Sequence, residues 1–462
     1  MATARLAALL LRRGAPAGSA LHTGVPSASC RLTSSYVQGT LDIPLLTKTM
    51  GQCLDETAER FPDRDALVFC RDGVRKTFAQ FKEEVDQAAA GLLALGLKKG
   101  DRLGMWGPNK YEWVLMQFAT AQAGIILVSV NPAYQALELE FVIRKVGCKA
   151  LVFPTQFKTQ KYYDILKQSC PELEKSTPGG IKSKRLPNLS VVITMDSKLP
   201  GTFHMDEVMQ AGDSSHMKQL RAVQQTLACN EPINIQFTSG TTGSPKGATL
   251  SHRNIVNNAN LIGLRLGITE QDYRVGLPAP LYHCLASVGG CMVMALHGSS
   301  CIFSSPSFEG KAALEAVSQE KCSFLHGTPT MFIDMLSQPD FDSYDLSSLR
   351  GGKSDSSNGK ILRNWILLAP CWEAVLSFVS KSLFWREEFC CTSLVFHCYV
   401  SFPWGFLQEL CIFNISFILK QIGEGPFCSI GYSRELNLLN SGLTSHHRAA
   451  ADALCALGWC SP

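Results

Sequence analysis

One ten-residue segment, from Thr238 to Gly247, constrains this 462-residue chain more than any other. It reads Thr-Ser-Gly-Thr-Thr-Gly-Ser-Pro-Lys-Gly, and so combines five hydroxyl side chains with three glycines and one lysine. The apolar run 233–237 before it is typical of a strand, and Ser251 after it can cap a helix. Glycines allow backbone N–H groups to turn toward an anion, hydroxyls donate further hydrogen bonds, and lysine adds a positive charge. We therefore predict a strand, a polyphosphate-binding turn and a helix.

The order of residues in this segment decides between kinds of nucleotide site. A Walker A loop requires G-x-x-x-x-G-K-[ST], and Pro245 stands directly before Lys246, so a kinase or ATPase of that class is a distant alternative. An ordinary glycine- and serine-rich surface loop is the structural alternative. From the residues alone, the candidate phosphate-binding groups are the hydroxyls of Thr238, Ser239, Thr241 and Thr242, the backbone at Gly240, Gly243 and Gly247, and the ammonium of Lys246.

The segment closely resembles the phosphate loop of the adenylate-forming enzymes, which include acyl-CoA synthetases, luciferases and the adenylation domains of peptide synthetases. This resemblance implies that the β- and γ-phosphates are held by Thr238, Ser239, Gly240, Thr241, Thr242, Gly243, Ser244, Pro245 and Lys246. Further stretches resemble the acyl-CoA synthetases, namely 104–109, 112–119, 123–134, 280–283 and 327–332. The resemblance implies an α/β fold, with the layered sheets and helices of that family's large N-terminal AMP-binding domain over residues 36–352. It also implies that this domain is incomplete and that the small C-terminal domain is absent.

The same resemblance implies an ATP-dependent fatty acid–CoA ligase of the acid–thiol class, with medium-chain acids as substrates. In such enzymes a carboxylate attacks the α-phosphate of ATP, and the thiol of CoA then attacks the acyl-adenylate. ATP, CoA, Mg²⁺ and a fatty acid are the expected ligands, and the metal ligands stay unknown. His283 is the expected catalytic residue, as a gate or as a donor to the acyl carboxylate, with a structural histidine as the alternative. Tyr282 and Phe332 can equally well line the acyl pocket or pack in the core.

Periodicity independently favours an α/β fold. Residues 76–93 have the spacing of an amphipathic helix that ends near Gly96. Unbroken apolar runs at 125–130, 150–153 and 191–194 suit strands that helices cover on both faces, as in doubly wound sheets. Residues 169–190 hold three prolines and two glycines and are expected to form a long loop.

The N-terminal segment has a targeting composition. Residues 1–41 contain four arginines and no Asp, Glu or Lys, so they account for the whole net charge of +4. This arginine- and serine-rich leader predicts a mitochondrial transit peptide over residues 1–35 and a matrix location, with a secretory signal as the competitor. The remainder is neutral overall, so its net charge implies no basic surface for nucleic acid. The 18 cysteines show neither disulfide nor zinc spacing.

Residues 353–462 depart from the family pattern. The expected adenine loop, the Tyr-Gly-Thr-Glu stretch, the ribose-binding aspartate and the catalytic lysine do not follow, and Lys360 matches the lysine motif only superficially. We expect an unrelated tail, and the alternative function is an inactive fragment that at most binds nucleotide or a partner. Residues 389–407 lack charge and approach the length of a membrane span, although exposed apolar sequence is favoured, so membrane association is unlikely but possible through the tail. The oligomeric state stays unknown.

Overall fold

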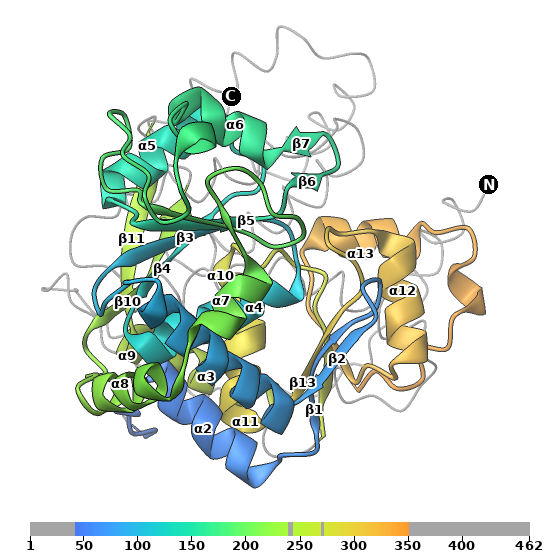
Figure 1. Cartoon of the computed structure of the whole chain (residues 1–462). Coiled ribbons are helices and arrows are strands. Elements are labelled where there is room, and N and C mark those ends of the chain that lie inside the picture. Colours follow the sequence, from blue (N-terminus) through green and yellow to red (C-terminus); the bar gives the residue numbers. More distant parts are fainter. Residues whose placement is uncertain (1–41, 239–243, 269–271, 351–462) are drawn as a thin grey trace, which may run out of the picture. The chain divides into compact units, whose positions relative to one another are not determined.

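The computed structural model describes residues 42–238, 244–268 and 272–350. All of them lie in the first of two units of the chain, residues 1–385. Helices and strands alternate along this region and form two main sheets and a small hairpin (Figure 1), which confirms the predicted α/β class.

The larger sheet has seven strands in the order β11-β10-β4-β3-β5-β8-β9. All neighbouring strands are parallel except β10 and β11, which are antiparallel. The strands are β3 (Arg102–Trp106), β4 (Ile126–Val130), β5 (Ala150–Phe153), β8 (Val191–Thr194), β9 (Phe203–His204), β10 (Pro232–Thr238) and β11 (Lys246–Ser251). The strands predicted at 125–130, 150–153 and 191–194 are thus confirmed.

Helices cover both faces of this sheet, as the unbroken apolar runs predicted. On β3, Leu103 and Met105 point into a core shared with the helices of one face, whereas Trp106 joins a second core with the helices of the other. The first face carries α3 (Phe78–Ala94), α4 (Tyr111–Ala123), α7 (Met205–Ala211) and α8 (Ser214–Gln225). The second face carries α5 (Ala136–Val146) and α6 (Tyr162–Ser169), which lie at the top of Figure 1.

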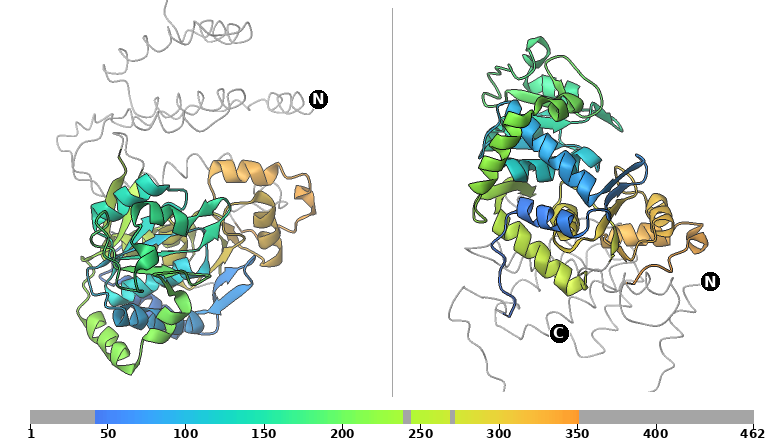
Figure 2. Two further views of the ribbon diagram at one scale, coloured as in Figure 1. Left: turned by 45° about the horizontal axis from the view of Figure 1, so that its top comes forward. Right: turned by 60° about the horizontal axis from the view of Figure 1, so that its bottom comes forward.

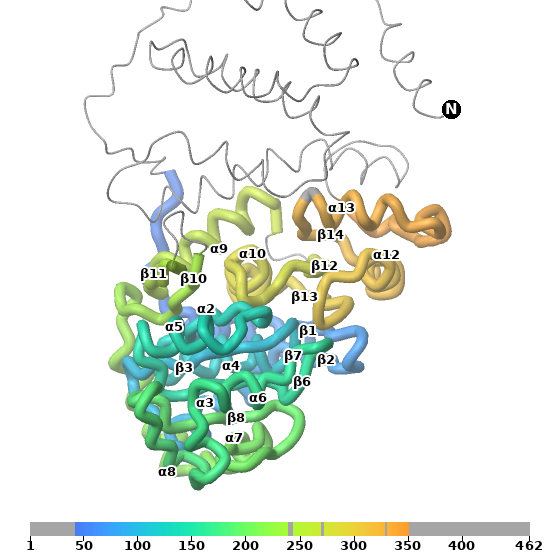
Figure 3. Tube along the Cα trace, turned by 90° about the horizontal axis from the view of Figure 1, so that it is seen from above, coloured from blue at the N-terminus to red at the C-terminus, as the bar shows by residue number. Residues whose placement is uncertain are grey.

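The second sheet has five strands in the order β14-β12-β13-β1-β2. Only β2 runs antiparallel to its neighbour in this sheet, and it forms a hairpin with β1 that the blue arrows of Figure 2 show. The strands are β1 (Asp65–Phe69), β2 (Val74–Thr77), β12 (Arg274–Gly276), β13 (Ser300–Phe303) and β14 (Phe324–Leu325). A third core packs α12 (Gly310–Gln319) and α13 (Pro329–Leu336) against this sheet (Figure 3).

The remaining elements connect or flank the two sheets. A small hairpin follows β5, formed by β6 (Gln156–Phe157) and β7 (Gln160–Lys161). The other helices are α2 (Met50–Arg60), α9 (His252–Leu266), α10 (Cys284–Ala286), the π-helix η2 (Ser287–Met292), α11 (Val293–His297) and the 3₁₀ turns η1 (Leu173–Lys175) and η3 (Phe341–Ser343). Residues 170–190 contain no strand or α-helix, which confirms the predicted long loop.

Local sequence explains where the helices begin and end. The helix predicted from residue 76 begins at Phe78, because Thr77 caps it and exchanges backbone and side-chain hydrogen bonds with Gln80. It ends before Gly96, whose φ of +82° is a conformation that favours glycine. Within the described ranges, no helix combines the length and apolar character that crossing a membrane requires. The uncharged stretch 389–407 lies outside the described residues.

Candidate functional site

The carboxyl ends of the parallel strands meet at one edge of the seven-stranded sheet. The helix α4 follows β3 on one face, and α5 follows β4 on the opposite face, so the ends of these neighbouring strands form a topological switch point. In open α/β sheets, ligands bind in the crevice outside such a point. The strand β10 lies next to β4 and ends at the same edge, where the predicted phosphate segment begins.

The predicted phosphate segment joins two antiparallel strands. Thr238 ends β10, Lys246 begins β11, and the two residues face each other as a cross-strand pair. The side chains of Thr238, Ser244 and Lys246 are exposed, and Pro245 is partly buried. The other predicted phosphate ligands, Ser239, Gly240, Thr241, Thr242 and Gly243, lie outside the described residues. The hydroxyl of Thr238 and the ammonium of Lys246 therefore mark the two ends of the predicted cradle.

The predicted order of strand, turn and helix was wrong in one respect. The strand β11 intervenes before α9, although Ser251 does cap that helix as predicted and accepts a hydrogen bond from Asn254 N at 3.2 Å. The sequence Lys-Gly-Ala-Thr-Leu-Ser gives no strand signal because β11 lies at the edge of the sheet, and only Leu250 of its six residues is buried.

His283 lies at the N-terminus of α10, after the segment that follows β12. Its Nδ1 accepts a hydrogen bond from Leu285 N at 3.2 Å, so Nδ1 carries no proton and the Nε2 of the neutral ring is the donor. Surrounding protein atoms lower the pKa of the imidazole by desolvation, although the side chain is open to solvent. The hydrogen bond from Leu285 N is the stronger reason for the neutral form, because burial shifts the pKa of a solvent-accessible ring less than that of an enclosed one.

A chain of hydrogen bonds tethers the backbone of His283 to β10. Gln236 lies two residues before Thr238, and its Nε2 donates to Ser287 Oγ at 3.2 Å. Ser287 Oγ in turn donates to the carbonyl oxygen of His283 at 3.2 Å, and Gln117 Nε2 donates to the Ser287 carbonyl at 2.9 Å. The predicted catalytic residue and the predicted phosphate segment are thereby joined through two polar side chains.

Asn109 joins the two sheets beside this site. Its Nδ2 donates to the carbonyl oxygen of Ala279 at 2.9 Å, and its Oδ1 accepts from Leu281 N at 2.8 Å. All three residues are buried. Because Asn109 follows β3 and the segment 279–281 leads to His283, this amide fixes where His283 stands relative to the switch point.

Phe332 and Tyr282, for which both pocket lining and core packing were possible, differ in burial. Phe332 is buried in the core with α12 and contacts Gly327 closely, so core packing accounts for its position. Tyr282 is only partly buried, and burial raises the pKa of its hydroxyl. The pKa of Tyr134, from the stretch after β4, is also raised, first by burial and then by the nearby Tyr282. Tyr282 packs against the first core from a partly buried position, so pocket lining stays a prediction for it.

Sequence reasoning missed one further histidine at the carboxyl end of a strand. His326 follows β14, is 3 % exposed and lies against the ring of Phe324, with 5.1 Å between centroids. Burial lowers the pKa of His326 to about 4, and its Nε2 has no hydrogen-bond partner in the part of the chain that the structure describes. Only its place beside the stretch 327–332 could have indicated it.

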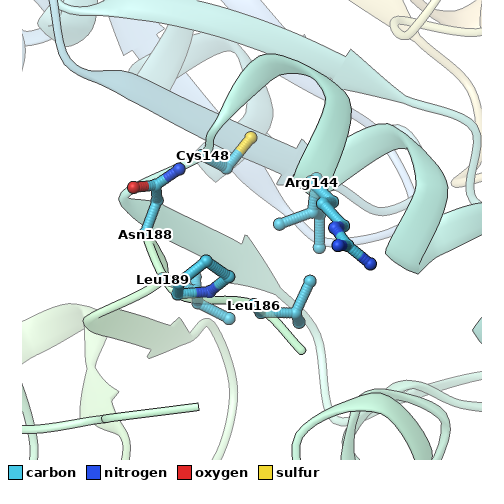
Figure 4. Close-up of a pocket in the computed structure, with 7 residues that line it drawn as sticks. Arg144, Cys148, Leu186, Asn188 and Leu189 are labelled. Carbon is cyan, nitrogen blue, oxygen red and sulfur yellow. The ribbon is translucent and has the colours of Figure 1, made fainter. Parts of the chain in front are cut away.

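A small cavity lies elsewhere and does not belong to this site (Figure 4). It measures about 10 Å³, enough for a single water molecule at most. Its lining comes from the segments that precede β5 and β8, so it lies at the amino edge of the sheet: Ile143, Arg144, Cys148, Leu186, Pro187, Asn188 and Leu189.

Comparisons with known proteins agree with this architecture. The chain is 66 % identical over 322 residues to the mitochondrial medium-chain acyl-CoA ligase ACSF2 of Bos taurus, covering 69 % of this chain and 52 % of that protein. It is 60 % identical over 334 residues to the protein of the same name from Danio rerio, covering 72 % and 55 %. The chain thus spans about half the length of these curated relatives. Their names also confirm the mitochondrial location predicted from the leader.

Solved structures share the fold at low identity. The anthranilate CoA ligase AuaEII in complex with anthranoyl-AMP superposes with a TM-score of 0.56 at 22 % identity, covering 67 % of this chain and 55 % of that one. The N-terminal domain of FACL13 from Mycobacterium tuberculosis superposes with a TM-score of 0.54 at 23 % identity, covering 69 % and 73 %. The model of the family described as AMP-binding enzyme matches residues 54–399. The chain therefore belongs to the AMP-binding enzyme family.

Proposed function

We propose that this chain is of ATP-dependent fatty acid–CoA ligase lineage and that its function is the reaction of those enzymes. The reaction converts a carboxylic acid, ATP and CoA into acyl-CoA, AMP and diphosphate through an acyl-adenylate. The name of the bovine relative supports medium-chain acids as the substrates. Because the chain spans about half of that protein, the reaction and its substrates are inferred from the shared half.

The observation that carries this proposal is the pairing of Thr238 with Lys246 across the β10–β11 hairpin at the switch point. A lysine ammonium and a threonine hydroxyl that project side by side from one face of a hairpin can bind a polyphosphate together. Phosphoryl transfer depends mainly on positioning and on neutralising charge, so a fixed cation at this place lowers the barrier to loss of diphosphate. We expect the remaining residues of the segment, 239–245, to add backbone and hydroxyl donors.

His283 supports the same chemistry as a donor. Because its Nδ1 is occupied by Leu285 N, the neutral ring can offer Nε2–H to an oxygen of the acyl carboxylate. Its tether through Ser287 and Gln236 holds the backbone of His283 in place relative to β10, where the phosphate segment begins. In the first step a carboxylate oxygen attacks the α-phosphorus and diphosphate leaves. In the second step the CoA sulfur attacks the acyl carbon and AMP leaves.

Magnesium is expected to arrive with the nucleotide. No three His, Cys, Asp or Glu side chains gather into a metal site anywhere in residues 42–238, 244–268 and 272–350. The described residues therefore do not fit an all-protein magnesium site, although Mg²⁺ is commonly held by substrate phosphates and few protein oxygens. We expect any protein ligands of the metal to lie outside the described ranges.

A second candidate is a protein that binds nucleotide without forming acyl-CoA. The observation that favours it lies in the sequence, because residues 353–462 contain no Tyr-Gly-Thr-Glu stretch, although the family model extends to residue 399. The loss of one well-placed charge stabiliser commonly lowers the rate by about 10² to 10³. On this reading the hairpin would still bind ATP.

The test is diphosphate exchange with octanoate and ATP on the purified chain, run beside a version that carries the C-terminal half of the bovine relative. ATP affinity is measured on the same samples. Exchange by the chain itself supports the ligase proposal. ATP binding without exchange supports the second candidate, and the absence of ATP binding overturns both.

A further inference from the structure

Positive charge is concentrated on the face of the larger sheet that α5 and α6 cover. Residues 136–190 hold ten Lys and Arg but five Asp and Glu, which gives this stretch a net charge of +5. Because residues 42–462 sum to zero, the rest of that range carries −5. Such an asymmetry marks a surface that attracts an anionic partner.

Much of this charge is not neutralised by neighbouring carboxylates. Three cations of the stretch have ion pairs, since Lys149 pairs with Asp101, Lys167 with Glu174 and Arg185 with Glu140. Other cations are exposed and have no ion pair within 4.0 Å among the described residues. We call the surface that carries them the basic face, and it includes Arg144, Lys145, Lys158, Lys161, Lys182 and Lys184.

Hydrogen bonds hold the parts of the basic face together. Gln135, at the start of α5, donates from its Nε2 to Gln160 Oε1 on β7 at 2.8 Å. Arg185 bonds to Glu140 of α5 through Nε at 3.0 Å and to the Gln168 carbonyl of α6 through Nη1 at 2.6 Å. The two helices, the β6–β7 hairpin and the segment 182–185 therefore form one connected layer, whose helices and hairpin lie together in Figure 1.

Apolar side chains lie among these cations. Leu137 on α5 is 77 % exposed, whereas the next most exposed large hydrophobic side chain of the described residues reaches 46 %. Phe141 follows one turn later on the same helix face, and Lys145 Nζ lies 5.1 Å from its ring centroid. On the hairpin, Lys158 Nζ lies 5.5 Å from the ring of Phe157. An exposed leucine beside ring–lysine pairs is typical of a surface that lies in a lipid interface.

We propose that the basic face docks on an anionic phospholipid surface, with Leu137 inserted among the headgroups and the lysines against the phosphates. A nucleic acid or an acidic protein would satisfy the charges but would leave Leu137 in water or need a matching pocket. Leu137 lies in the first turn of α5, the helix that follows β4, so docking brings the switch-point edge of the sheet toward the membrane. The proposal stands whether or not the chain forms acyl-CoA.

The test is co-sedimentation of the full chain with vesicles of phosphatidylcholine alone and with about a third phosphatidylserine, at about 0.1 M and about 1 M salt. Binding is expected only to the anionic vesicles, and only at the lower salt. Each cation near such a surface strengthens binding by about fivefold, so Lys158→Gln with Lys161→Gln should weaken it by roughly 25-fold. Leu137→Ser should weaken it by about tenfold, because the leucine loses its burial.

A matched pair of substitutions controls for net charge. Lys98 and Lys218 are exposed and have no ion pair among the described residues, but they lie on other surfaces. Lys98→Gln with Lys218→Gln should change binding by less than about twofold. The cationic leader and the apolar tail are present in every sample, so differences between variants report on the basic face. Equal losses in the two pairs, equal binding to neutral vesicles, or binding to RNA but not to vesicles would overturn the proposal.

Discussion

Replacing Asn109 with alanine should destabilise the junction between the two sheets. The substitution removes the donor to the Ala279 carbonyl at 2.9 Å and the acceptor for Leu281 N at 2.8 Å. Both backbone groups belong to residues that are fully buried, so water cannot replace the lost partners without opening the core. An unsatisfied buried group costs about 1.5 kcal/mol, so the two together should lower the free energy of unfolding by about 3 kcal/mol.

Thermal unfolding and amide hydrogen exchange measure this effect. A loss of about 3 kcal/mol should lower the melting temperature by roughly 6 °C or more. The amide of Leu281 should exchange faster in the variant, because it has lost its acceptor. Asn230→Ala is the matched control, since Asn230 is exposed and, among the described residues, its side chain accepts a single weak hydrogen bond, from the Cys229 thiol. A variant with unchanged melting temperature and unchanged exchange at Leu281 would refute the role assigned to Asn109.

Three other predictions concern packing, pH and targeting. Gly91→Ala should destabilise the fold by about 2 kcal/mol or more in denaturant titrations, because its Cβ would lie 1.9 Å from the Val208 carbonyl oxygen. Gly289→Ala is the control and should change stability by less than about 0.5 kcal/mol, because no described neighbour would lie closer than 4.0 Å to its Cβ. Burial lowers the pKa of His326 from 6.5 to about 4. As the pH is lowered from 6.5 toward 4, the unfolded chain therefore binds a proton that the folded chain does not, and the free energy of unfolding falls. His326→Phe should reduce that fall by roughly 1.4 kcal/mol per pH unit, and an unchanged pH profile would contradict it. Replacing Arg5, Arg12 and Arg13 of the leader with glutamate should leave a reporter fusion in the cytosol, as seen by microscopy. Undiminished mitochondrial import of this variant would contradict the role of the leader.

The sequence predicted the central strands well because their environment is uniform. β5 and β8 are buried on both faces, so every residue in them is buried and the apolar runs have the same bounds as the strands. The edge strand β11 has the opposite environment and gives no such signal. Prediction therefore failed where a strand forms through backbone pairing with little side-chain burial.

The candidate site divides in the same way. A local motif identified Lys246 and Thr238, and the structure adds that they face each other across a hairpin. The tether of His283 could not be predicted, because Gln236 and Ser287 are 51 residues apart, and Asn109 and Leu281 are 172 residues apart. Such contacts depend on how the strands are ordered in two sheets, which no local pattern encodes.

The most direct test of the account is ATP binding by the chain and by Lys246→Ala, measured by titration calorimetry. If the hairpin grips the polyphosphate, the loss of a hydrogen bond to a charged group should weaken binding by about 1.5–3 kcal/mol. Lys98→Ala, which removes an exposed lysine elsewhere, should leave the affinity unchanged. Equal ATP affinity in the wild type and Lys246→Ala would contradict the assignment of the phosphate site to this hairpin.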